Sequence, residues 1–461
     1  MVNVPTNSLL PNVAPILSPG VRCVLAIAFV LALLGLLAGA LVIPFTFESP
    51  SLWYKFGAAK ISLRAGKMIG IAAGLLVLLQ LPLAGRSKLL DRIYSLPALM
   101  RQHRMHAWAI ASMAIVHPLL VLLAEGSLVV PLESRYWPEW VGVGLLAAIL
   151  AQFISSRWRR SLGIAFHVWL PAHRIAGLLV AGLLIVHVLY VSESFSDQGP
   201  PRWLVMAAAA CFLSVWLWRR TEWWRARRHR FSVSRITTTG TDCTCVELTP
   251  QTKTPFAYVP GQFAFVSFRS TAVSAEPHAF TISSTPSRPE ALQFTIRACG
   301  DWTRDAAGLS TGDEVLLHGP FGRFGHLFSG GNRELIMIAG GIGVTPMLSM
   351  LRFMADADDP RPVTLVWSNR SRETTVFDEE MAVLAARLTA FRHVPIFTRN
   401  AVNGNRSGRL NRTALEQILR GCSRKAAVYV CGPPRMMKQI VADLKALGFP
   451  ARSIHTEAFG L

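Results

Sequence analysis

The hydrophobic residues of this chain are concentrated in its first half. Six apolar segments lie at residues 22–44, 62–84, 103–124, 138–156, 170–191 and 202–218. Each is close to the ~20 residues that a helix needs to cross the hydrocarbon core of a bilayer. After about residue 230, short apolar runs separated by polar turns replace these long segments. The pattern predicts a multidomain membrane protein that begins with a six-helix transmembrane bundle.

The first apolar segment has a second interpretation. It ends in Leu36-Leu37-Ala38-Gly39-Ala40, which is typical of a signal-peptide cleavage site. Its hydrophobic core is long for that role, and one arginine, Arg22, precedes it. We therefore expect a retained transmembrane helix.

The charges between the segments alternate from one connection to the next. Cations occupy three places: Arg86, Lys88, Arg92, Arg101 and Arg104, then Arg157, Arg159 and Arg160, and finally the stretch 219–228. The third-to-fourth and fifth-to-sixth connections carry Glu125, Glu133, Glu139, Glu193 and Asp197 instead. Because cytoplasmic loops are enriched in Lys and Arg, we expect a multi-pass protein of the cell membrane with both termini in the cytoplasm.

Charge and cysteine content argue against two other classes of protein. The formal net charge is +20, but many of the cations flank apolar segments, so we expect the chain to have a lipid bilayer and no nucleic acid as a partner. The seven cysteines form no Cys-x-x-Cys pair and no four-cysteine group. An iron–sulfur cluster is therefore not expected.

Two soluble folds follow the helices. Short β-rich runs at 231–234, 245–248, 263–268, 292–296 and 314–317 are separated by Pro- and Gly-rich turns. They predict a small antiparallel β-barrel. From about residue 334, buried strands beginning at Leu335, Val363 and Ala427 alternate with Gly turns and helices. That alternation predicts an α/β nucleotide-binding domain with a parallel sheet.

Four histidines in the apolar segments share one spacing. His103 and His117 in the third segment are fourteen residues apart, as are His173 and His187 in the fifth. Fourteen helical residues place two side chains within ~40° of each other and ~21 Å apart along the axis. Because both segments cross in the same direction, His103 is expected level with His173, and His117 with His187. Two facing pairs are what two b-type haems with axial imidazole ligands require.

Two further histidines leave the ligand set open. His106 lies eleven residues before His117 and on the same helix face, so it is an alternative ligand. It has no counterpart three residues after His173, which favours a structural role. His167 is expected before the fifth helix, at the membrane interface. Four histidine ligands leave neither iron an open position, so the haems are predicted to relay electrons.

A seven-residue motif in the barrel region identifies a family. The segment His278-Ala279-Phe280-Thr281-Ile282-Ser283-Ser284 follows Pro260-Gly261-Gln262-Phe263 by the length of one loop and strand. Together with the histidine pairs it resembles the ferric reductase and NADPH oxidase family, over roughly residues 60–461. The resemblance implies a transmembrane haem domain (1–222), an FAD-binding β-barrel domain (223–332) and an NAD(P)-binding α/β domain (333–461).

The resemblance also assigns flavin contacts to two motifs. In the first, Phe280 packs on the flavin, Thr281 bonds near N5, where hydride arrives, and His278 holds the ribityl-phosphate portion, with Ser284 at the end of the motif. Ala279 replaces the proline common in the family. The second motif is Arg297-Ala298-Cys299-Gly300-Asp301-Trp302-Thr303. Its turn at Gly300 is expected to expose N–H groups to the FAD pyrophosphate, with Arg297 and Thr303 as further donors and Trp302 beside them.

Two segments of the α/β domain are assigned to the nicotinamide coenzyme. Gly340-Gly341-Ile342-Gly343-Val344-Thr345-Pro346 follows a buried strand and opens a helix. Its glycines let the backbone approach a pyrophosphate, whose charge the helix N-terminus favours. Cys431-Gly432-Pro433 resembles the family segment that meets the nicotinamide, so Cys431 is expected beside the hydride-transfer site.

Two assignments keep alternatives. Arg370 and Arg372 follow the Val363 strand, where this fold contacts the adenosine ribose. They would bind the 2′-phosphate of NADPH, which favours NADPH over NADH as the coenzyme. The alternative is that both are solvated cations of a loop. Phe459 matches the family's aromatic terminus and either covers the flavin or belongs to a frayed end. Thr281, Cys431 and Phe459 are the residues predicted at the reacting centre.

These assignments predict a transmembrane oxidoreductase. Electrons from cytoplasmic NAD(P)H would pass through FAD and two haems to an extracytoplasmic acceptor, either ferric iron or molecular oxygen, which gives superoxide. A periplasmic redox protein is a further acceptor that the sequence leaves open. The alternatives are a membrane-tethered flavin reductase without haem and a haem-binding anchor with an inactive reductase module.

Overall fold

The computed structural model describes residue 10 and residues 16–48, 51–127, 129–191, 195, 199–226, 229–252, 256–329, 333–399 and 406–457. Contacts divide the chain into two units. One is helical and comprises residues 23–222, and the other is formed by residues 1–22 and 223–461.

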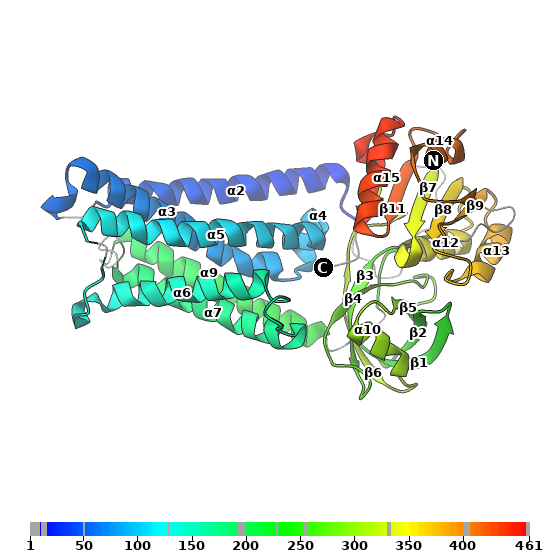
Figure 1. The fold of residues 1–461 in the computed structure, drawn as a ribbon, viewed down its shortest axis with the longest axis horizontal. Helices are drawn as coiled ribbons and strands as arrows, with labels where there is room; N and C mark the ends of the chain where they lie inside the picture. Colours follow the sequence, from blue (N-terminus) through cyan, green and yellow to red (C-terminus); the bar gives the residue numbers. More distant parts are fainter. Residues whose placement is uncertain are drawn as a thin grey trace. The chain divides into compact units, whose positions relative to one another are not determined.

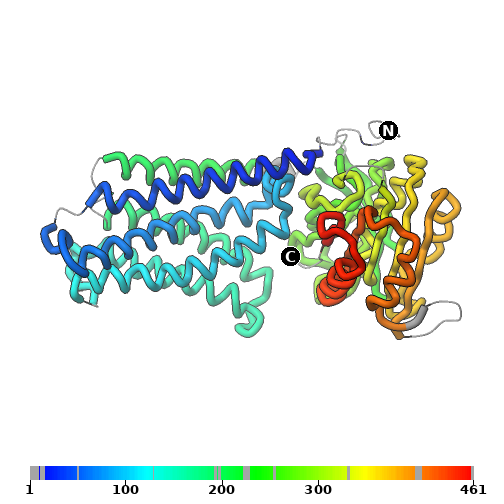
Figure 2. The backbone as a smooth tube through the Cα atoms, turned by 90° about the horizontal axis from the view of Figure 1, so that it is seen from above, coloured from blue at the N-terminus to red at the C-terminus, as the bar shows by residue number. Residues whose placement is uncertain are grey.

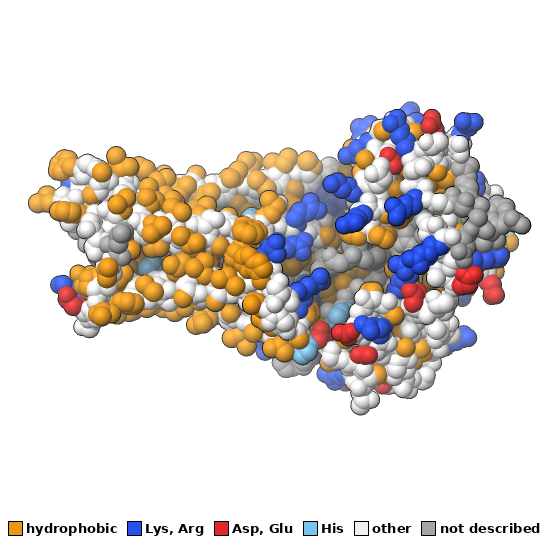
Figure 3. All heavy atoms as spheres, viewed as in Figure 1, with side chains coloured by type: hydrophobic (Ala, Val, Ile, Leu, Met, Phe, Trp, Pro, Cys, Tyr) orange, Lys and Arg blue, Asp and Glu red, His pale blue; other side chains and the backbone are white. Residues whose placement is uncertain are grey.

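Six long helices make up the helical unit (Figures 1 and 2). They are α2 (Pro19–Thr46), α3 (Gly57–Ala84), α5 (Leu96–Glu125), α6 (Trp137–Arg157), α7 (Phe166–Val191) and α9 (Pro200–Ala226). All six are long and apolar enough to cross a membrane, and hydrophobic side chains cover the face seen in Figure 3. Each predicted apolar segment falls inside one of these helices, so the predicted six-helix bundle is confirmed.

The helices extend beyond the apolar segments because local hydrogen bonds, and not hydrophobicity, set their ends. α5 begins at Leu96, whose N–H donates to the buried Asp91 side chain at 2.7 Å. Asp91 belongs to a short helix that was not predicted, α4 (Lys88–Tyr94). His167, expected before the fifth helix, lies in the first turn of α7.

Two helical hairpins form the centre of the bundle: α3 packs along α5, and α6 along α7. One residue from each helix contributes to a small apolar cluster of Val77, Ile110, Leu145 and Val180. Ile110 is seven residues from both His103 and His117, and Val180 is seven residues from both His173 and His187. The cluster therefore lies midway between two levels of histidines.

The first sheet of the other unit is antiparallel and has the strand order β4-β3-β6-β1-β2-β5. Its strands are β1 (Arg230–Thr239), β2 (Cys243–Pro250), β3 (Phe263–Arg269), β4 (His278–Thr281), β5 (Leu292–Arg297) and β6 (Glu314–Phe321). A bridge between Ile282 and Phe294 joins the ends of the order, β4 and β5. The sheet thus closes around an apolar core that includes Phe231, Leu248 and Phe268, as predicted for a barrel.

The second sheet is parallel throughout, with the order β10-β9-β8-β7-β11-β12. Its elements are β7 (Leu335–Gly340), α12 (Thr345–Asp356), β8 (Val363–Asn369), α13 (Asp378–Arg387), β9 (Phe391–Phe397), β10 (Arg406–Ser407), α14 (Arg412–Ile418), β11 (Ala427–Cys431), α15 (Pro434–Ala446) and β12 (Ile454–Glu457). The predicted parallel α/β domain is confirmed. Strand β9 escaped prediction because Arg392, His393 and Pro395 interrupt its apolar pattern.

The order of this sheet places two loops side by side. From β7 the chain builds β8 and β9 on one side and later returns to build β11 on the other. The loops that follow β7 and β11 therefore leave the same sheet edge from adjacent strands. Ligands of open parallel sheets bind at such a switch point, outside the carboxyl ends of the strands.

Candidate cofactor sites

The structure brings the four predicted histidines together in two pairs, named here the inner pair (His103 and His173) and the outer pair (His117 and His187). The ring centroids lie 6.2 Å apart in the inner pair and 6.4 Å apart in the outer pair, with interplanar angles of 76° and 83°. Two metal–imidazole bonds of about 2 Å, plus the ring radius at each end, give nearly the same separation. Each pair therefore has the spacing needed to hold one metal ion between two imidazoles.

His106 is not part of either pair. Among the described residues, no ring contact joins His106 to a histidine of another helix. It is His103 that faces His173. The structure thus favours the ligand set that excludes His106.

Each outer histidine is held by a backbone carbonyl and a glycine of the neighbouring helix. His117 Nδ1 lies 2.8 Å from Gly66 O, and a Cβ on Gly70 would lie 2.8 Å from the same ring. His187 Nδ1 lies 3.1 Å from Pro138 O, and a Cβ on Gly142 would lie 2.5 Å from that ring. Because a carbonyl can only accept, Nδ1 carries the proton and Nε2 keeps its lone pair for a metal.

A related arrangement recurs fourteen residues further along α3 and α6, where both positions are glutamine. Gln80 follows Gly66 by fourteen residues and lies beside His103. Gln152 follows Pro138 by the same number, and its amide donates to His173 O at 3.3 Å. The contacts at this level differ from those of the outer pair, because Nδ1 of His103 has no hydrogen-bond partner among the described residues and Nδ1 of His173 lies 3.2 Å from Ser156 Oγ.

Sequence reasoning missed these supporting residues. The α5 and α7 histidines were found by their fourteen-residue spacing, and the same spacing separates Gly66 from Gln80 and Pro138 from Gln152 on the partner helices. A search for that interval among the small and polar residues of every apolar segment would have found them. Hydropathy alone does not reveal these residues, because an isolated glycine or glutamine barely changes the mean hydropathy of an apolar segment.

Three arginines gather near the inner pair. Arg174 is next to His173 in sequence, and Arg219 of α9 donates to Leu81 O at 3.5 Å. Burial, together with the positive charges of Arg174 and Arg219, lowers the pKa of Arg86 to about 9. Such a concentration of positive charge attracts carboxylates or phosphates.

The barrel unites the two predicted flavin motifs in one aromatic surface. The rings of His278 and Trp302 have centroids 4.0 Å apart, and Trp302 stacks on Phe280 at 5.7 Å. Trp302 Nε1 donates to Ser274 O at 2.9 Å, which fixes the indole. Aromatic rings arranged in this way offer flat surfaces to a planar ligand.

Thr281 and Ser284 are buried where β4 approaches the α/β domain. Ser284 Oγ lies 2.9 Å from Tyr258 OH, and Ser284 O accepts a hydrogen bond of 2.6 Å from Ser349 of α12. The end of the flavin motif is therefore joined directly to the helix that follows the glycine-rich turn.

The turn of the second flavin motif is held by a threonine. The N–H groups of Cys299 and Gly300 donate to Thr303 Oγ1, both at 2.9 Å. A nearby hydroxyl satisfies turn amides in the absence of another acceptor. Arg297 pairs with Asp242 at 2.8 Å and also lies against Gly341 of the α/β domain.

The two predicted coenzyme loops pack backbone against backbone. A Cβ on Gly343 would collide with Cys431 O, and one on Gly432 would lie 3.0 Å from Gly340 N. Gly341 has φ +55°, which favours glycine. Thr345 Oγ1 donates to Ile342 O at 3.0 Å, and Pro346 occupies the first turn of α12. Residues 340–346 and 431–433 thus form one surface at the switch point.

Three family models match this chain in the order of its domains. A ferric reductase like transmembrane component matches residues 69–184, an FAD-binding domain matches 228–323, and an oxidoreductase NAD-binding domain matches 337–442. The chain has the domain architecture of the ferric reductase and NADPH oxidase family.

Other proteins are similar to parts of this chain. The glycine betaine monooxygenase reductase subunit of Chromohalobacter salexigens is 27% identical over 249 residues, 52% of this chain and 66% of that protein. The NADH oxidoreductase HCR of Escherichia coli is 31% identical over 199 residues, 42% of this chain and 57% of that protein. The chain therefore spans less than two thirds of either relative. The flavohem-like FAD/NAD binding domain of a Vibrio cholerae nitric oxide dioxygenase has a TM-score of 0.46 at 22% identity, covering 50% of this chain and 99% of that domain.

The remaining residues assigned by the ferric reductase resemblance occupy different environments. Cys431 is fully buried at the end of β11, and burial and then Glu457 raise the pKa of its thiol well above the ordinary value. Arg370 and Arg372 are exposed, and Arg372 lies 3.3 Å from Asp378, an acidic neighbour that the sequence reasoning did not consider. Phe459 lies outside the described residues.

Proposed function

We propose that this chain is a membrane oxidoreductase that uses NAD(P)H, FAD and two b-type haems to deliver electrons to an acceptor on the far side of the membrane. The matched FAD and NAD domains, and relatives named as a reductase subunit and an oxidoreductase, support this class. The arginine-rich connections support a cytoplasmic location for both termini and for the NAD(P)H site.

The pairing of the four histidines is the observation that carries the proposal. Ring separations of 6.2 and 6.4 Å fit two metal ions, each held by two imidazoles. His117 and His187 present Nε2 because carbonyls hold Nδ1. A haem iron held by both imidazoles of a pair would suit electron relay better than binding of a substrate at the metal.

Other residues of the chain would hold the remaining groups. Arg86, Arg174 and Arg219 offer positive charge to the carboxylates of a haem at the inner pair. Phe280 and Trp302 offer flat surfaces to the flavin, and the loops 340–346 and 431–433 offer backbone to the coenzyme. When bound, FAD accepts hydride from NAD(P)H and the haems carry single electrons. The buried Cys431 thiol stays protonated and shapes the coenzyme surface without supplying charge.

Haem content of the full-length protein tests the proposal. We expect about two haems per chain in the pyridine haemochrome assay, and about one in His117→Ala, because two axial ligands hold each haem. This variant should lose reduction of external acceptors while NAD(P)H still reduces its flavin. His167→Ala, at an exposed site, is the control and should keep both haems.

Two results would replace the proposal with a rival. A wild-type protein that shows flavin but no Soret absorbance, after expression with ample haem, would be a membrane-tethered flavin reductase. A protein that binds haem and FAD but does not oxidise NAD(P)H would be an anchor with an inactive reductase module.

A further inference from the structure

One ion pair of the barrel reaches the surface assigned to the coenzyme. Arg297 is the last residue of β5, and its Nε donates to Asp242 Oδ2 at 2.8 Å. A terminal nitrogen of the same guanidinium, Nη1, lies so close to Gly341 that a Cβ there would come within 2.8 Å of it. Gly341 belongs to the glycine-rich loop 340–346. Asp242 therefore holds the Nε side of Arg297, while a terminal nitrogen faces this loop.

Asp242 is itself fixed by two further contacts. Its backbone carbonyl accepts from Ala298 N at 2.8 Å, and its Oδ1 accepts from Cys243 Sγ at 3.5 Å. Burial, then the neighbouring Asp242 carboxylate, raises the pKa of the Cys243 thiol to about 12, so the thiol keeps its proton and can donate it. The carboxylate therefore has a defined position from which it holds Arg297.

The turn of the barrel that carries Asp242 also contacts the loop after β8. A Cβ on Gly240 would lie 3.5 Å from Glu373 O, which is ordinary van der Waals contact. This loop follows the strand where the fold contacts the adenosine ribose. Trp367 Nε1 of β8 donates to Gly341 O at 2.9 Å, which fixes the glycine-rich loop. Because β7 and β8 are neighbours in the sheet, their loops lie side by side, and the barrel contacts both.

We propose that Asp242 is a positioning residue that directs the Arg297 guanidinium to the pyrophosphate of the nicotinamide coenzyme at Gly341. The inference rests on the proposed function, which requires a bound coenzyme, and it assigns Arg297 to this ligand as well as to FAD. Both ligands offer the same chemistry, because an arginine donates its N–H groups to phosphate oxygens. The contact with Gly341 favours the coenzyme, and the FAD pyrophosphate is the competing partner.

The charge of Asp242 and its positioning role predict opposite effects. If the carboxylate acted only through its charge, its removal should strengthen the binding of a phosphate group nearby. If Asp242 positions Arg297, its removal should weaken that binding, because the guanidinium then gains rotamers that must be given up when the ligand binds. The side-chain oxygen of asparagine also accepts from Nε, so Asp242→Asn should keep the guanidinium in place. Alanine and asparagine variants together therefore separate the two effects.

Binding of ADP-ribose, which carries the pyrophosphate common to NADH and NADPH, tests the inference in full-length protein saturated with FAD. In isothermal titration calorimetry we expect Asp242→Ala to raise the Kd about fivefold and Arg297→Gln about tenfold. Asp242→Asn should stay within about twofold of the wild type, and Asp242→Ala should add nothing in an Arg297→Gln background. Glu314→Gln is the matched control, because Glu314 pairs with Arg230 and Arg269 at the other end of β1 and should leave the Kd unchanged.

The Kd of FAD is measured for the same variants by flavin fluorescence. If the wild type binds no FAD or does not oxidise NAD(P)H, the proposed function fails. With both intact, the inference is overturned by unchanged or tighter ADP-ribose binding in Asp242→Ala, by an equal loss in Asp242→Asn, or by a wild type that does not bind ADP-ribose. A loss confined to the Kd of FAD also overturns it and leaves Arg297 to the flavin alone. If Asp242→Ala does not fold, an unchanged Kd of ADP-ribose in Arg297→Gln has the same consequence.

Discussion

Single glycines decide where the outer histidine rings lie. A methyl group on Gly70 or Gly142 would come within 2.8 or 2.5 Å of the facing imidazole, closer than carbon atoms approach in proteins. The clash is with a ring that a backbone carbonyl also holds, so the ring cannot move without losing its hydrogen bond. The positions of the outer rings therefore depend on the missing side chains of Gly70 and Gly142 as well as on the histidines themselves.

Gly142→Ala should displace His187 and lower the haem content by about one equivalent per chain, because the outer pair loses one axial ligand. Gly144→Ala on the same helix is the control, since a Cβ there meets nothing within 4 Å. The pyridine haemochrome assay distinguishes the two variants. Equal haem in both would show that the ring tolerates a neighbouring methyl group.

His326 makes the stability of the unit that contains the barrel and the α/β domain, called here the reductase unit, depend on pH. It is buried, and neither ring nitrogen has a hydrogen-bond partner among the described residues. Burial, then the nearby Arg361, lowers its pKa from 6.5 to about 3. Between these values the unfolded chain binds a proton that the folded chain does not, so stability falls as the pH falls from 6.5 towards 3.

His326→Leu should flatten this dependence, which amounts to at most about 1.4 kcal/mol per pH unit. Calorimetric melts of the full-length protein in detergent at pH 6.5, 5.5 and 4.5 provide the measurement. His167→Leu, at an exposed site, should keep the slope of the wild type. A slope unchanged in His326→Leu would mean that other groups control the acid response.

At the scale of elements, one arginine joins α12 to the end of the flavin strand. Arg352 donates to both carboxylate oxygens of Glu380, at 2.6 and 2.8 Å. It also donates to Ser283 O at 2.8 Å and to Gln293 Oε1 at 2.5 Å. Because α12 follows the glycine-rich turn, Arg352 couples the predicted coenzyme loop to the predicted flavin motif.

Arg352→Leu should lower the free energy of unfolding by about 2 kcal/mol, since it leaves Glu380 and two further acceptors without their donor. It should also slow flavin reduction by NAD(P)H. Arg387→Leu is the control, because Arg387 forms a single, more exposed ion pair with Asp356 and should contribute less than about 1 kcal/mol. Denaturant unfolding and stopped-flow flavin absorbance measure the two effects.

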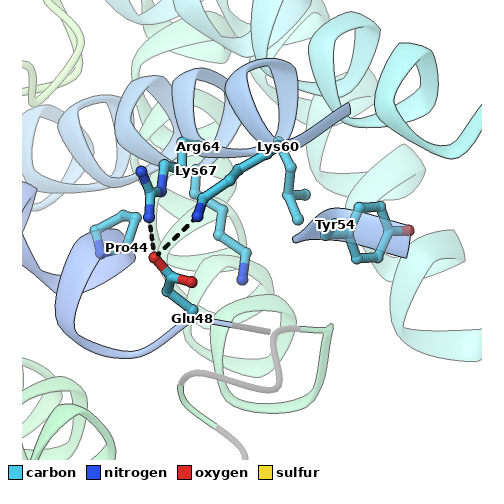
Figure 4. Close-up of a pocket in the computed structure, with 7 residues that line it drawn as sticks. Pro44, Glu48, Tyr54, Lys60, Arg64 and Lys67 are labelled. Atoms are coloured by element: carbon cyan, nitrogen blue, oxygen red, sulfur yellow. Dashed lines mark hydrogen bonds and ion pairs between the residues drawn. The ribbon is translucent and has the colours of Figure 1, made fainter. Parts of the chain in front are cut away.

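At the scale of the whole molecule, the alternation of charge between helices predicts one orientation. The Arg157–Arg160 connection should face the cytoplasm, and the Glu133–Arg135 connection should face outside. Lys60, Arg64 and Lys67, towards the other end of α3 from Arg86, are an exception to this alternation of charge (Figure 4).

Cysteine labelling tests the orientation. With a membrane-impermeant maleimide on intact cells, Arg135→Cys should react above the wild-type background and Arg160→Cys only after the membrane is opened. The opposite pattern would place the reductase unit outside. Both variants must retain the haem spectrum of the wild type.

The sequence by itself determined the six membrane helices, the barrel, the parallel sheet and the four histidines, because hydrophobic period, charge and fourteen-residue spacing are local properties of a chain. It did not find β9, the carbonyls of Gly66 and Pro138, the glycines against the rings or the role of Arg352. Each of these depends on a neighbour distant in sequence: Gly142 matters only because His187, 45 residues later, lies against it. Such contacts follow from tertiary packing, because packing determines which helix faces lie against each other. It also places His103 opposite His173, in agreement with the preference for His103 that the sequence indicated from the missing counterpart of His106.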